Sequence, residues 1–442
     1  MKRNNLLNCL SIIFVIGLII HQSALVYAAG GDLDFSFGFG GKIRTDTGYN
    51  DKVNALATQP DGKIVVAGER DINGAKGLIA RYNADGSLDE SFGFGGFIAD
   101  AAHGGHGTIF HAVLVQPDGK IVAAGNFNES SAGGCPHSQS WIVRYNPNGS
   151  NDTTFGGGDG KVEYPYVYVN GCPVDSFHYA LAIQNDGKIL AAGTSKNSFG
   201  DFDFAAMRLN TDGSLDTSFN LDGKGIFPIS TTVLPERAYA VAVQSDGRIV
   251  LAGHSYSNVT ISDFALIMLN SQGLYDWNFG GTGKVTTDIG GDENAYAVAF
   301  QGDGKIVAAG RRVTNANSPS LVRYNTNGSL DGSFGFGGKV ATDCSLPCDG
   351  AYGMALQSNG RIVAVGRDGI GTSYNFAVFR YRTGGSLDST FSGDGQLMTD
   401  FTNYTDHAWE VVIQADGKIV VAGSSSNGIG GYNSIALARY LP

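Results

Sequence analysis

One position in the chain recurs every 56 to 68 residues and is occupied mainly by aromatic side chains that carry a polar atom. In chain order it reads Asn54, His111, Tyr179, Tyr239, Tyr296, Tyr352 and Trp409. Such side chains combine an apolar ring with a hydrogen-bonding tip, which suits sugars and other amphipathic ligands. They are also often buried, so packing between neighbouring sheets is the alternative interpretation. If the position lines a common axis, its six aromatic members form a candidate ligand-binding ring.

The residue after the aromatic position is small in six copies and acidic in the last. The six small residues are Ala55, Ala112, Ala180, Ala240, Ala297 and Gly353, and the acid is Glu410. We add Glu410 to the candidate binding site, since it would lie near the same axis. A pocket lined by His111, His178 or Glu410 would also suit acid–base chemistry if its environment shifted their pKa values. No serine-nucleophile elbow, phosphate-binding loop or zinc-protease motif occurs, so catalytic residues stay unassigned.

Two metal sites have some support in the sequence. Five histidines that would suit zinc or copper are His103, His106, His111, His137 and His178. However, His103 and His106 flank two glycines in a loop, and no supporting residues are evident, so we predict no metal site. The turn at residues 83–89 places Asn and Asp around a Gly, as calcium loops do. Repeated Asx turns explain the same residues; we expect no cofactor, with calcium at these turns as the alternative.

A unit of about 60 residues positions these side chains. The segment at 59–68, Gln-Pro-Asp-Gly-Lys-Ile-Val-Val-Ala-Gly, recurs seven times with substitutions. Its Asp-Gly or Asn-Gly pair is a two-residue hairpin signal. In the second unit, strands are predicted at 110–116, 120–125, 140–145 and 161–164, and no segment shows a helical period. Four strands per unit predict an all-β, seven-bladed β-propeller with one antiparallel sheet per blade, and a β-helix is the less favoured fold.

The incomplete units at the two ends support a closed ring. A turn and a fourth strand at 42–44 precede the first complete unit, and a third strand at 436–440 ends the last one. We therefore predict that the N-terminal strand joins the C-terminal blade, pairing Ile43 with Leu437. Such pairing would remove two exposed sheet edges.

Two further signatures accompany the repeated segment. Leu-Asp-x-Ser-Phe-Gly begins at Leu33 and Leu88, and Arg-Tyr-Asn begins at Arg81, Arg144 and Arg323. Together with the segment at 59–68, they resemble the delta-60 repeat of bacterial exported proteins, over essentially all of residues 31–442. The resemblance implies a propeller architecture and a bacterial origin. It implies no catalytic residues.

The first 28 residues are typical of a secretory signal peptide. Lys2 and Arg3 precede an apolar run, and small residues favour cleavage after Ala28. Residues 29–442 are then one propeller domain that is exported to the periplasm, the medium or the cell surface, where disulfides form. Cys135 and Cys172 fall in neighbouring loops and are predicted to pair. Cys344 and Cys348 are predicted to pair locally.

Composition excludes several classes of protein. The chain has 65 glycines in 442 residues, 42% hydrophobic residues and only 16% charged residues, which argues against disorder. A net charge of −11 argues against nucleic-acid binding, since phosphates would be repelled. No mature segment is apolar enough to span a membrane, and we expect a monomer.

The predicted turns differ between the two faces of the propeller. Turns between the first and second strands and between the third and fourth are nearly identical in all units, whereas the other connections vary. Binding residues concentrate on loops that a rigid scaffold holds; drift in unconstrained loops is the alternative. The sequence favours a secreted, non-enzymatic binding or scaffold protein that recognises a protein, glycan or surface ligand through its varied face. An exported hydrolase or lyase with a site at the axial mouth is the alternative function.

Overall fold

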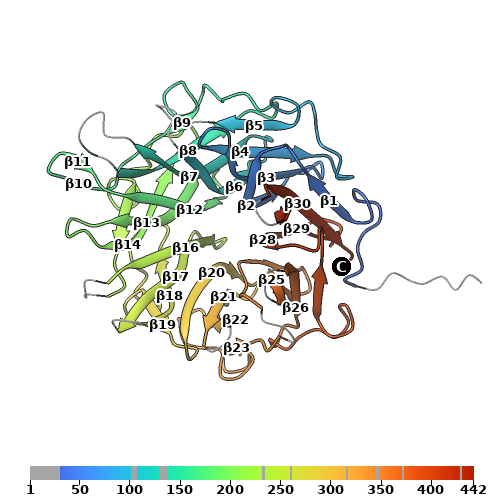
Figure 1. Ribbon diagram of the computed structural model, residues 1–442. Helices are drawn as coiled ribbons and strands as arrows, with labels where there is room; N and C mark the ends of the chain where they lie inside the picture. The colour runs from blue at the N-terminus through green and yellow to red at the C-terminus, as the bar shows by residue number, and fades with distance from the viewer. Residues whose placement is uncertain are drawn as a thin grey trace, which may run out of the picture.

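Seven four-stranded antiparallel sheets surround a central axis, and the chain passes through them in order (Figure 1). The computed structural model describes residues 30–100, 107–129, 135, 137–230, 234–258, 261–314, 317–344, 348–370, 373–428 and 431–442. The predicted signal peptide, His103 and His106 lie outside these ranges. The predicted fold class, a seven-bladed propeller, is confirmed.

The strands of each blade follow one another from the axis outward. Blades 1 to 3 consist of β2 (Asn50–Thr58), β3 (Ile64–Asp71), β4 (Ala75–Tyr82) and β5 (Phe97–Asp100); β6 (Thr108–Val115), β7 (Ile121–Glu129), β8 (His137–Tyr145) and β9 (Lys161–Val162); and β12 (Ser176–Ile183), β13 (Ile189–Lys196), β14 (Phe202–Leu209) and β15 (Lys224–Phe227). A small hairpin of β10 (Tyr168–Val169) and β11 (Cys172–Pro173) lies between blades 2 and 3 in the chain.

Blades 4 to 7 repeat this order. They consist of β16 (Glu236–Val243), β17 (Ile249–Asn258), β18 (Ile261–Leu269) and β19 (Lys284–Thr287); β20 (Asp292–Phe300), β21 (Ile306–Val313), β22 (Asn317–Tyr324) and β23 (Lys339–Ala341); β24 (Gly353–Leu356), β25 (Ile362–Ile370), β26 (Ser373–Tyr381) and β27 (Gln396–Thr399); and β28 (Asp406–Ile413), β29 (Ile419–Ser426), β30 (Asn433–Tyr440) and β1 (Lys42–Thr45). Within the described ranges, we find no helical segment with the length and hydrophobicity needed to traverse a bilayer.

Strand β1 closes the ring by pairing with β30. Ile43 lies opposite Leu437 in the antiparallel register, as predicted. In Figure 1 the blue N-terminal strand accordingly lies beside the red C-terminal strands. Neighbouring first strands also contact each other in a complete circle around the axis. The closed circle provides a rigid wall for any site on the axis.

The second and third strands form the core because they are covered on both sides by neighbouring blades. Ile64 to Gly68 of β3, for example, are all buried. One prediction of strand length was wrong: β9 ends at Val162 rather than at residue 164. Beyond it the chain leaves the sheet, and the Tyr166 hydroxyl lies 3.1 Å from His178 Nε2.

The Arg-Tyr-Asn and Leu-Asp-x-Ser-Phe-Gly signatures of one blade meet in an Arg–Asp pair, and the same arginine also reaches the next blade. In blade 5, Arg323 Nε donates to Asp331 Oδ2 at 2.7 Å, and the guanidinium lies 4.5 Å from the Phe334 ring centroid. Arg323 Nη1 also donates to the Thr383 carbonyl of the next blade at 2.5 Å. Equivalent Arg–Asp pairs are Arg81–Asp89, Arg144–Asp152, Arg208–Asp216, Arg380–Asp388 and Arg439–Asp34. The repeated signatures therefore encode contacts between blades.

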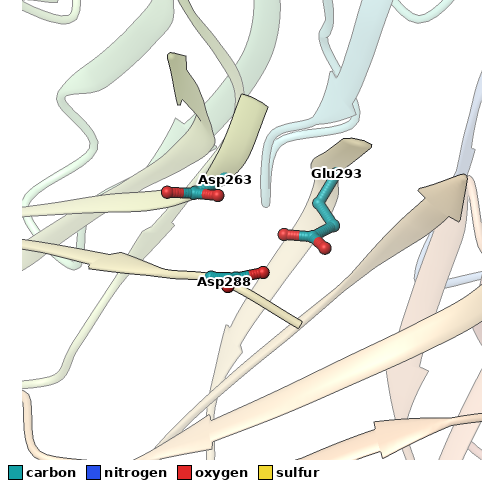
Figure 2. Close-up of side chains that lie close together, drawn as sticks. All are labelled: Asp263, Asp288 and Glu293. Carbon is teal, nitrogen blue, oxygen red and sulfur yellow. The ribbon is translucent and has the colours of Figure 1, made fainter. Parts of the chain in front are cut away.

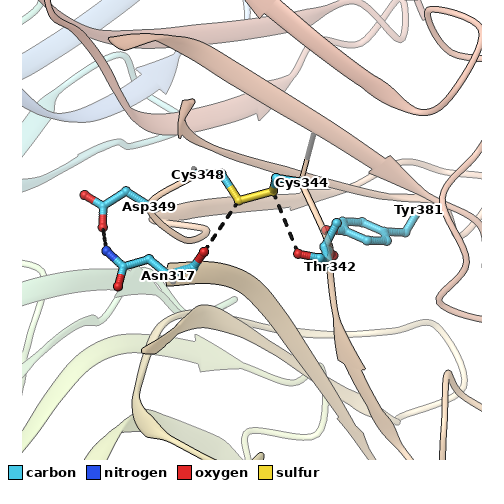
Figure 3. The surroundings of a disulfide bond; sticks show 6 residues. All are labelled: Asn317, Thr342, Cys344, Cys348, Asp349 and Tyr381. Atoms are coloured by element: carbon cyan, nitrogen blue, oxygen red, sulfur yellow. Dashed lines mark hydrogen bonds between the residues drawn. A yellow bond between two sulfur atoms is a disulfide. The ribbon is translucent and has the colours of Figure 1, made fainter. Parts of the chain in front are cut away.

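Both predicted disulfides are present. Cys135 pairs with Cys172, which joins the loop after β7 to the hairpin before β12. The connections from second to third strand and from fourth to first strand therefore share one face, which we call the variable-loop face. Cys344 pairs with Cys348, and each sulfur lies 3.8 Å from a backbone carbonyl oxygen, of Thr342 and Asn317 (Figure 3).

Candidate functional site

In six of the seven blades, a β-bulge aims the residue of the recurring aromatic position at the axis. In blade 4, the pairing of β16 with β17 is interrupted between Ala238 and Ala240, so Tyr239 is the extra residue of the bulge. The same interruption occurs in blades 1, 2, 3, 5 and 7. Bulges re-aim side chains and often occur beside binding sites. The position that the sequence spacing singled out is thus the extra residue of a β-bulge in most blades.

The glycine that ends each repeated Ile-Val-Val-Ala-Gly segment permits this bulge. Gly253 lies opposite Ala238, and a Cβ atom on Gly253 would come within 1.7 Å of the Arg237 carbonyl oxygen. No side chain fits at such a distance, so only glycine allows the two backbones to approach. The same contact, at 1.7 to 2.1 Å, is found at the other six glycines, which are Gly68, Gly125, Gly193, Gly310, Gly366 and Gly423.

Six aromatic rings form a continuous arc around the axis. Centroids of consecutive rings lie 5.0, 5.5, 5.1, 5.1 and 4.8 Å apart, with interplanar angles from 37° to 58°. The rings in order are His111, Tyr179, Tyr239, Tyr296, Tyr352 and Trp409. Asn54 occupies the seventh place and donates from Nδ2 to the Phe110 carbonyl at 2.9 Å. These contacts are the packing that the sequence analysis gave as an alternative, but the rings also line an open hollow.

The hollow at this ring has a volume of about 390 Å³ and is lined by the ring, Asn54 and Glu410. A second hollow of about 180 Å³ shares His111, Glu410 and three of the tyrosines, and continues along the axis past the small residues. The structure therefore brings together all seven predicted ligand-binding residues. His178, the other candidate for acid–base chemistry, does not line either hollow and is buried between blades 2 and 3 beside Tyr166.

Burial shifts the titration of the acid and the histidine in the ring in opposite senses. Burial raises the pKa of Glu410 to about 7. It lowers the pKa of His111, although a hydrogen bond to Asn126 opposes this shift. His111 Nε2 lies 2.7 Å from Asn126 Oδ1. Because an amide oxygen only accepts, Nε2 carries the proton. At neutral pH the hollow thus offers a neutral imidazole and a carboxyl group that can gain or lose a proton.

A group of charged side chains at the rim was missed by the sequence analysis. Arg367 Nε donates to Asp349 Oδ2 at 2.7 Å, and Arg367 Nη1 lies 2.5 Å from His407 Nε2. The His407 ring stacks on Trp409 with centroids 5.2 Å apart. Arg311, one blade earlier, has Nη1 3.7 Å from Asp349 Oδ1. Arg311 and Arg367 directly follow the repeated glycine. The residue at this position differs from unit to unit, and this variation is the signal by which the sequence could have revealed the group.

The other metal candidates find protein partners instead. His137 contacts the Cys135 carbonyl and the Gln139 side chain, and no described histidine belongs to a group of three metal-ligating residues. In the turn at 83–89, Asp85 Oδ1 accepts from the backbone and hydroxyl of Ser87, as in an Asx turn. Asp89 is paired with Arg81. Calcium at these turns stays an untested alternative.

A sequence profile described as "Domain of unknown function (DUF5122) beta-propeller" matches every repeat. The matched residues are 59–92, 116–155, 184–219, 244–279, 301–334, 357–391 and 414–442. The chain belongs to this family. The seven matches of the DUF5122 profile begin at the repeated Asp-Gly hairpin and, except for the last, end in the turn between the third and fourth strands.

Several solved structures resemble this DUF5122 propeller in fold. A streptogramin B lyase structure aligns with a TM-score of 0.50 at 11% identity, covering 90% of this chain and 97% of that one. The polysaccharide lyase Uly1 aligns at 0.46 with 12% identity, covering 88% and 89%. Sqt1 from Chaetomium thermophilum aligns at 0.46 with 13% identity, covering 89% and 97%. At these identities the likeness shows the fold alone. No curated protein matches the DUF5122 chain in sequence.

Proposed function

We propose that the protein is an exported, non-enzymatic binding propeller that holds a glycan in its axial hollow. The observation that carries the proposal is the ring of polar-tipped aromatic side chains around a hollow of about 390 Å³. This volume falls within the range of small-molecule sites. Sugars present both apolar C–H faces and hydroxyl groups, so they match a wall that offers rings, phenol hydroxyls, an amide and a carboxyl group.

Another hollow, on the opposite face of the propeller, is a weaker candidate. It has a volume of about 530 Å³ and lies between the repeated turns of blades 3 and 4, on the face opposite the variable loops. Its arginine, Arg208, donates to Asp216 and to the Ser271 carbonyl, and its Lys188 pairs with Asp186 and Asp216. Because these charges are already paired within the protein, a ligand would have to displace contacts that hold the blades together.

The location of the protein follows the same proposal. Two disulfides among the described residues are consistent with an oxidising compartment outside the cytoplasm. Residues 1–28 would be removed as a signal peptide, and residues 29–442 would act as one monomeric propeller domain.

One observation favours a second function, an exported hydrolase or lyase. Glu410 and His111 line the same two hollows, and the pKa of Glu410, raised to about 7 by burial, suits a group that donates and accepts protons. In that case the glycan would be cleaved rather than held. The two functions share the site and differ in turnover.

Glycan-array screening of the purified chain, followed by calorimetry with the glycans bound, tests the proposal. We expect binding that Tyr239→Ala and Trp409→Ala weaken at least tenfold. The control is Trp277→Ala, which removes a tryptophan that is 71% exposed in a repeated turn. Tyr239→Phe separates loss of the hydroxyl from loss of the ring if the alanine variants do not fold.

Three results would contradict this proposal in different ways. Binding that survives both ring substitutions would place the ligand elsewhere. Capture of a protein with no glycan bound would favour a protein partner. Release of new reducing or unsaturated ends, abolished in Glu410→Gln, would establish the enzymatic alternative.

A further inference from the structure

Three carboxylates from different strands converge at the boundary between blades 4 and 5. Asp263 lies on β18, Asp288 directly follows β19, and Glu293 lies on β20. One carboxylate oxygen from each lies within 4.8 Å of the others. Figure 2 shows the three side chains directed at a common space. Asp263 and Glu293 are buried, whereas Asp288 is exposed, so the space has an opening to solvent.

One oxygen of Glu293 has no donor among the residues that the structure describes. The residue is 0% exposed, and its Oε2 accepts from the Ile289 amide at 3.1 Å. Its Oε1 has no hydrogen-bond partner among the described residues, and Figure 2 shows the Glu293 carboxylate group directed at the common space. A buried carboxylate oxygen without a donor, next to two more carboxylates, is costly unless a cation or a proton compensates it.

Two basic side chains donate to backbone carbonyls of the loop that carries Asp288. Lys339 Nζ donates to the Asp288 carbonyl at 2.6 Å, and Arg312 Nε donates to the Gly290 carbonyl at 3.1 Å. Both contacts hold the loop between β19 and β20 in place. They orient the loop that carries Asp288 rather than form an ion pair with its carboxylate.

The preceding boundary provides an internal comparison. There Asp203 and Glu236 occupy the positions of Asp263 and Glu293, but Pro228 replaces Asp288. Both oxygens of Glu236 are satisfied, by the amides of Ile229 and Ser230 and by the Ser255 hydroxyl. At that boundary, protein groups donate hydrogen bonds to both oxygens of the glutamate. At the boundary of blades 4 and 5, no described residue donates to Glu293 Oε1.

The other five boundaries each lack the acid on the third strand. The residues that replace Asp263 are Lys76, Gln139, Ser318, Asn375 and Ser434. Three acids at these positions therefore occur once among the seven boundaries. Their convergence is a departure from the repeat rather than a consequence of it.

We infer that Asp263, Asp288 and Glu293 form a binding site for a divalent cation, with Ca²⁺ as the ion that fits best. Ca²⁺ takes oxygen ligands at about 2.4 Å, so oxygens on opposite sides of one ion are about 4.8 Å apart, whereas Mg²⁺ at about 2.1 Å requires a tighter cage. The carboxylate oxygens lie up to 4.8 Å apart, so they can surround a Ca²⁺ ion without moving. Waters entering past Asp288 would complete the shell.

The site lies apart from the axial hollow, and its occupation does not depend on the proposed function. Glu293 is three residues before Tyr296 on β20, so a bound ion would link blades 4 and 5 close to the ring. An ion that binds only the folded state raises the unfolding temperature, and the stabilisation grows with the logarithm of one plus the ratio of ion concentration to dissociation constant.

Calorimetric titration of the purified chain with CaCl₂ at pH 7.5, and thermal unfolding with and without the ion, test the inference. NaCl at matched ionic strength and MgCl₂ are the salt controls. We expect Ca²⁺ to bind with a dissociation constant on the order of 10⁻⁴ to 10⁻³ M, as in open extracellular sites. The double variant Asp263→Asn, Asp288→Asn should weaken binding at least tenfold and lose the thermal shift.

Two further variants complete the test. Asp343→Asn removes the exposed acid that occupies the position of Asp288 one blade later, and it should leave Ca²⁺ binding unchanged. Glu293→Gln keeps an oxygen for the Ile289 amide and serves if the double variant does not fold. No Ca²⁺ binding by the wild type would overturn the inference and favour a shared proton, since burial raises the pKa of Glu293 to about 7. Equal binding by wild type and double variant would overturn it as well.

Discussion

The carboxylate of Glu410 occupies space beside Gly353 that a side chain would otherwise fill. A Cβ atom on Gly353 would lie 3.1 Å from Glu410 Oε1 and 2.8 Å from the Glu410 Cα and the Trp409 carbonyl oxygen. At the same position five other blades carry alanine. Glycine in blade 6 therefore leaves room for the backbone of blade 7 and for the Glu410 carboxylate, and the two departures from the repeat lie side by side in the axial hollow.

The first prediction is that Gly353→Ala destabilises the protein. The new methyl group would meet backbone atoms of blade 7, and such overpacking typically costs about 1–3 kcal/mol. Urea unfolding followed by fluorescence should show a lower midpoint. Gly384→Ala is the control, because a Cβ there meets no atom within 4 Å. An unchanged midpoint for Gly353→Ala would show that the two blades separate more easily than their contacts indicate.

The second prediction concerns the pH dependence that Glu410 gives to stability. Burial raises its pKa in the folded protein to about 7, above its ordinary value of 4.5. The folded state therefore binds the proton more tightly than the unfolded state, and this stabilises the fold below pH 4.5. The contribution is lost as pH rises from about 4.5 to 7.

Glu410→Gln isolates this contribution because other titrating groups cancel in the difference between the two proteins. We expect the unfolding temperature of the variant, relative to the wild type, to rise between pH 5 and pH 8. Thermal unfolding at four pH values in that range measures it. A constant difference across the range would mean that Glu410 titrates as an exposed acid.

The fold could be predicted from the sequence because its signals are local and repeated. The Asp-Gly hairpins set the strand order, and the split unit predicted the pairing of Ile43 with Leu437. The ring was predictable for the same reason, since one strand position recurs in every copy. The glycine opposite the bulge is visible in the repeated segment. Its role could not be predicted, because it depends on which residue of the neighbouring strand lies opposite it.

The remaining features depend on contacts that no single repeat contains. Asp263, Asp288 and Glu293 come from three strands and two blades, so only the packing of one blade on the next brings them together. His178 was predicted beside the axis, yet it precedes the bulged Tyr179 and turns between the blades instead. A bulge changes which residues face the axis, and its position is visible only once the sheet is paired.

The third prediction compares the two disulfides. Cys135 and Cys172 are 37 residues apart, whereas Cys344 and Cys348 are four apart. In the chain-entropy model the longer loop stabilises by about 4 kcal/mol and the shorter by about 2 kcal/mol. Replacing each pair by alanines should therefore lower the unfolding midpoint more for the longer loop. The reverse order would show that the short disulfide acts mainly by holding Asp349 against Arg367 in the folded state.

The fourth prediction concerns the arginine that links neighbouring blades. Arg323 and Asp331 are both buried, and Lys305 Nζ lies 3.0 Å from the same carboxylate oxygen as the guanidinium. Arg323→Met would leave the lysine as the only basic partner of Asp331, beside the amide and hydroxyl of Ser333, and the Thr383 carbonyl without its donor. Breaking a buried pair costs about 3–5 kcal/mol, and the remaining lysine should reduce this to about 2–4 kcal/mol.

Blade 4 shows that methionine fits at this position, since Met268 replaces the arginine there and is fully buried. Arg382→Met is the matched control, because Arg382 is half exposed and its contact with Asp388 is 3.4 Å long. We expect the control to change the free energy of unfolding by less than about 1 kcal/mol. Equal effects of the two substitutions in urea unfolding would mean that the buried pairs give the blades their register without adding to stability. In that case burial of the second and third strands alone would hold the ring together.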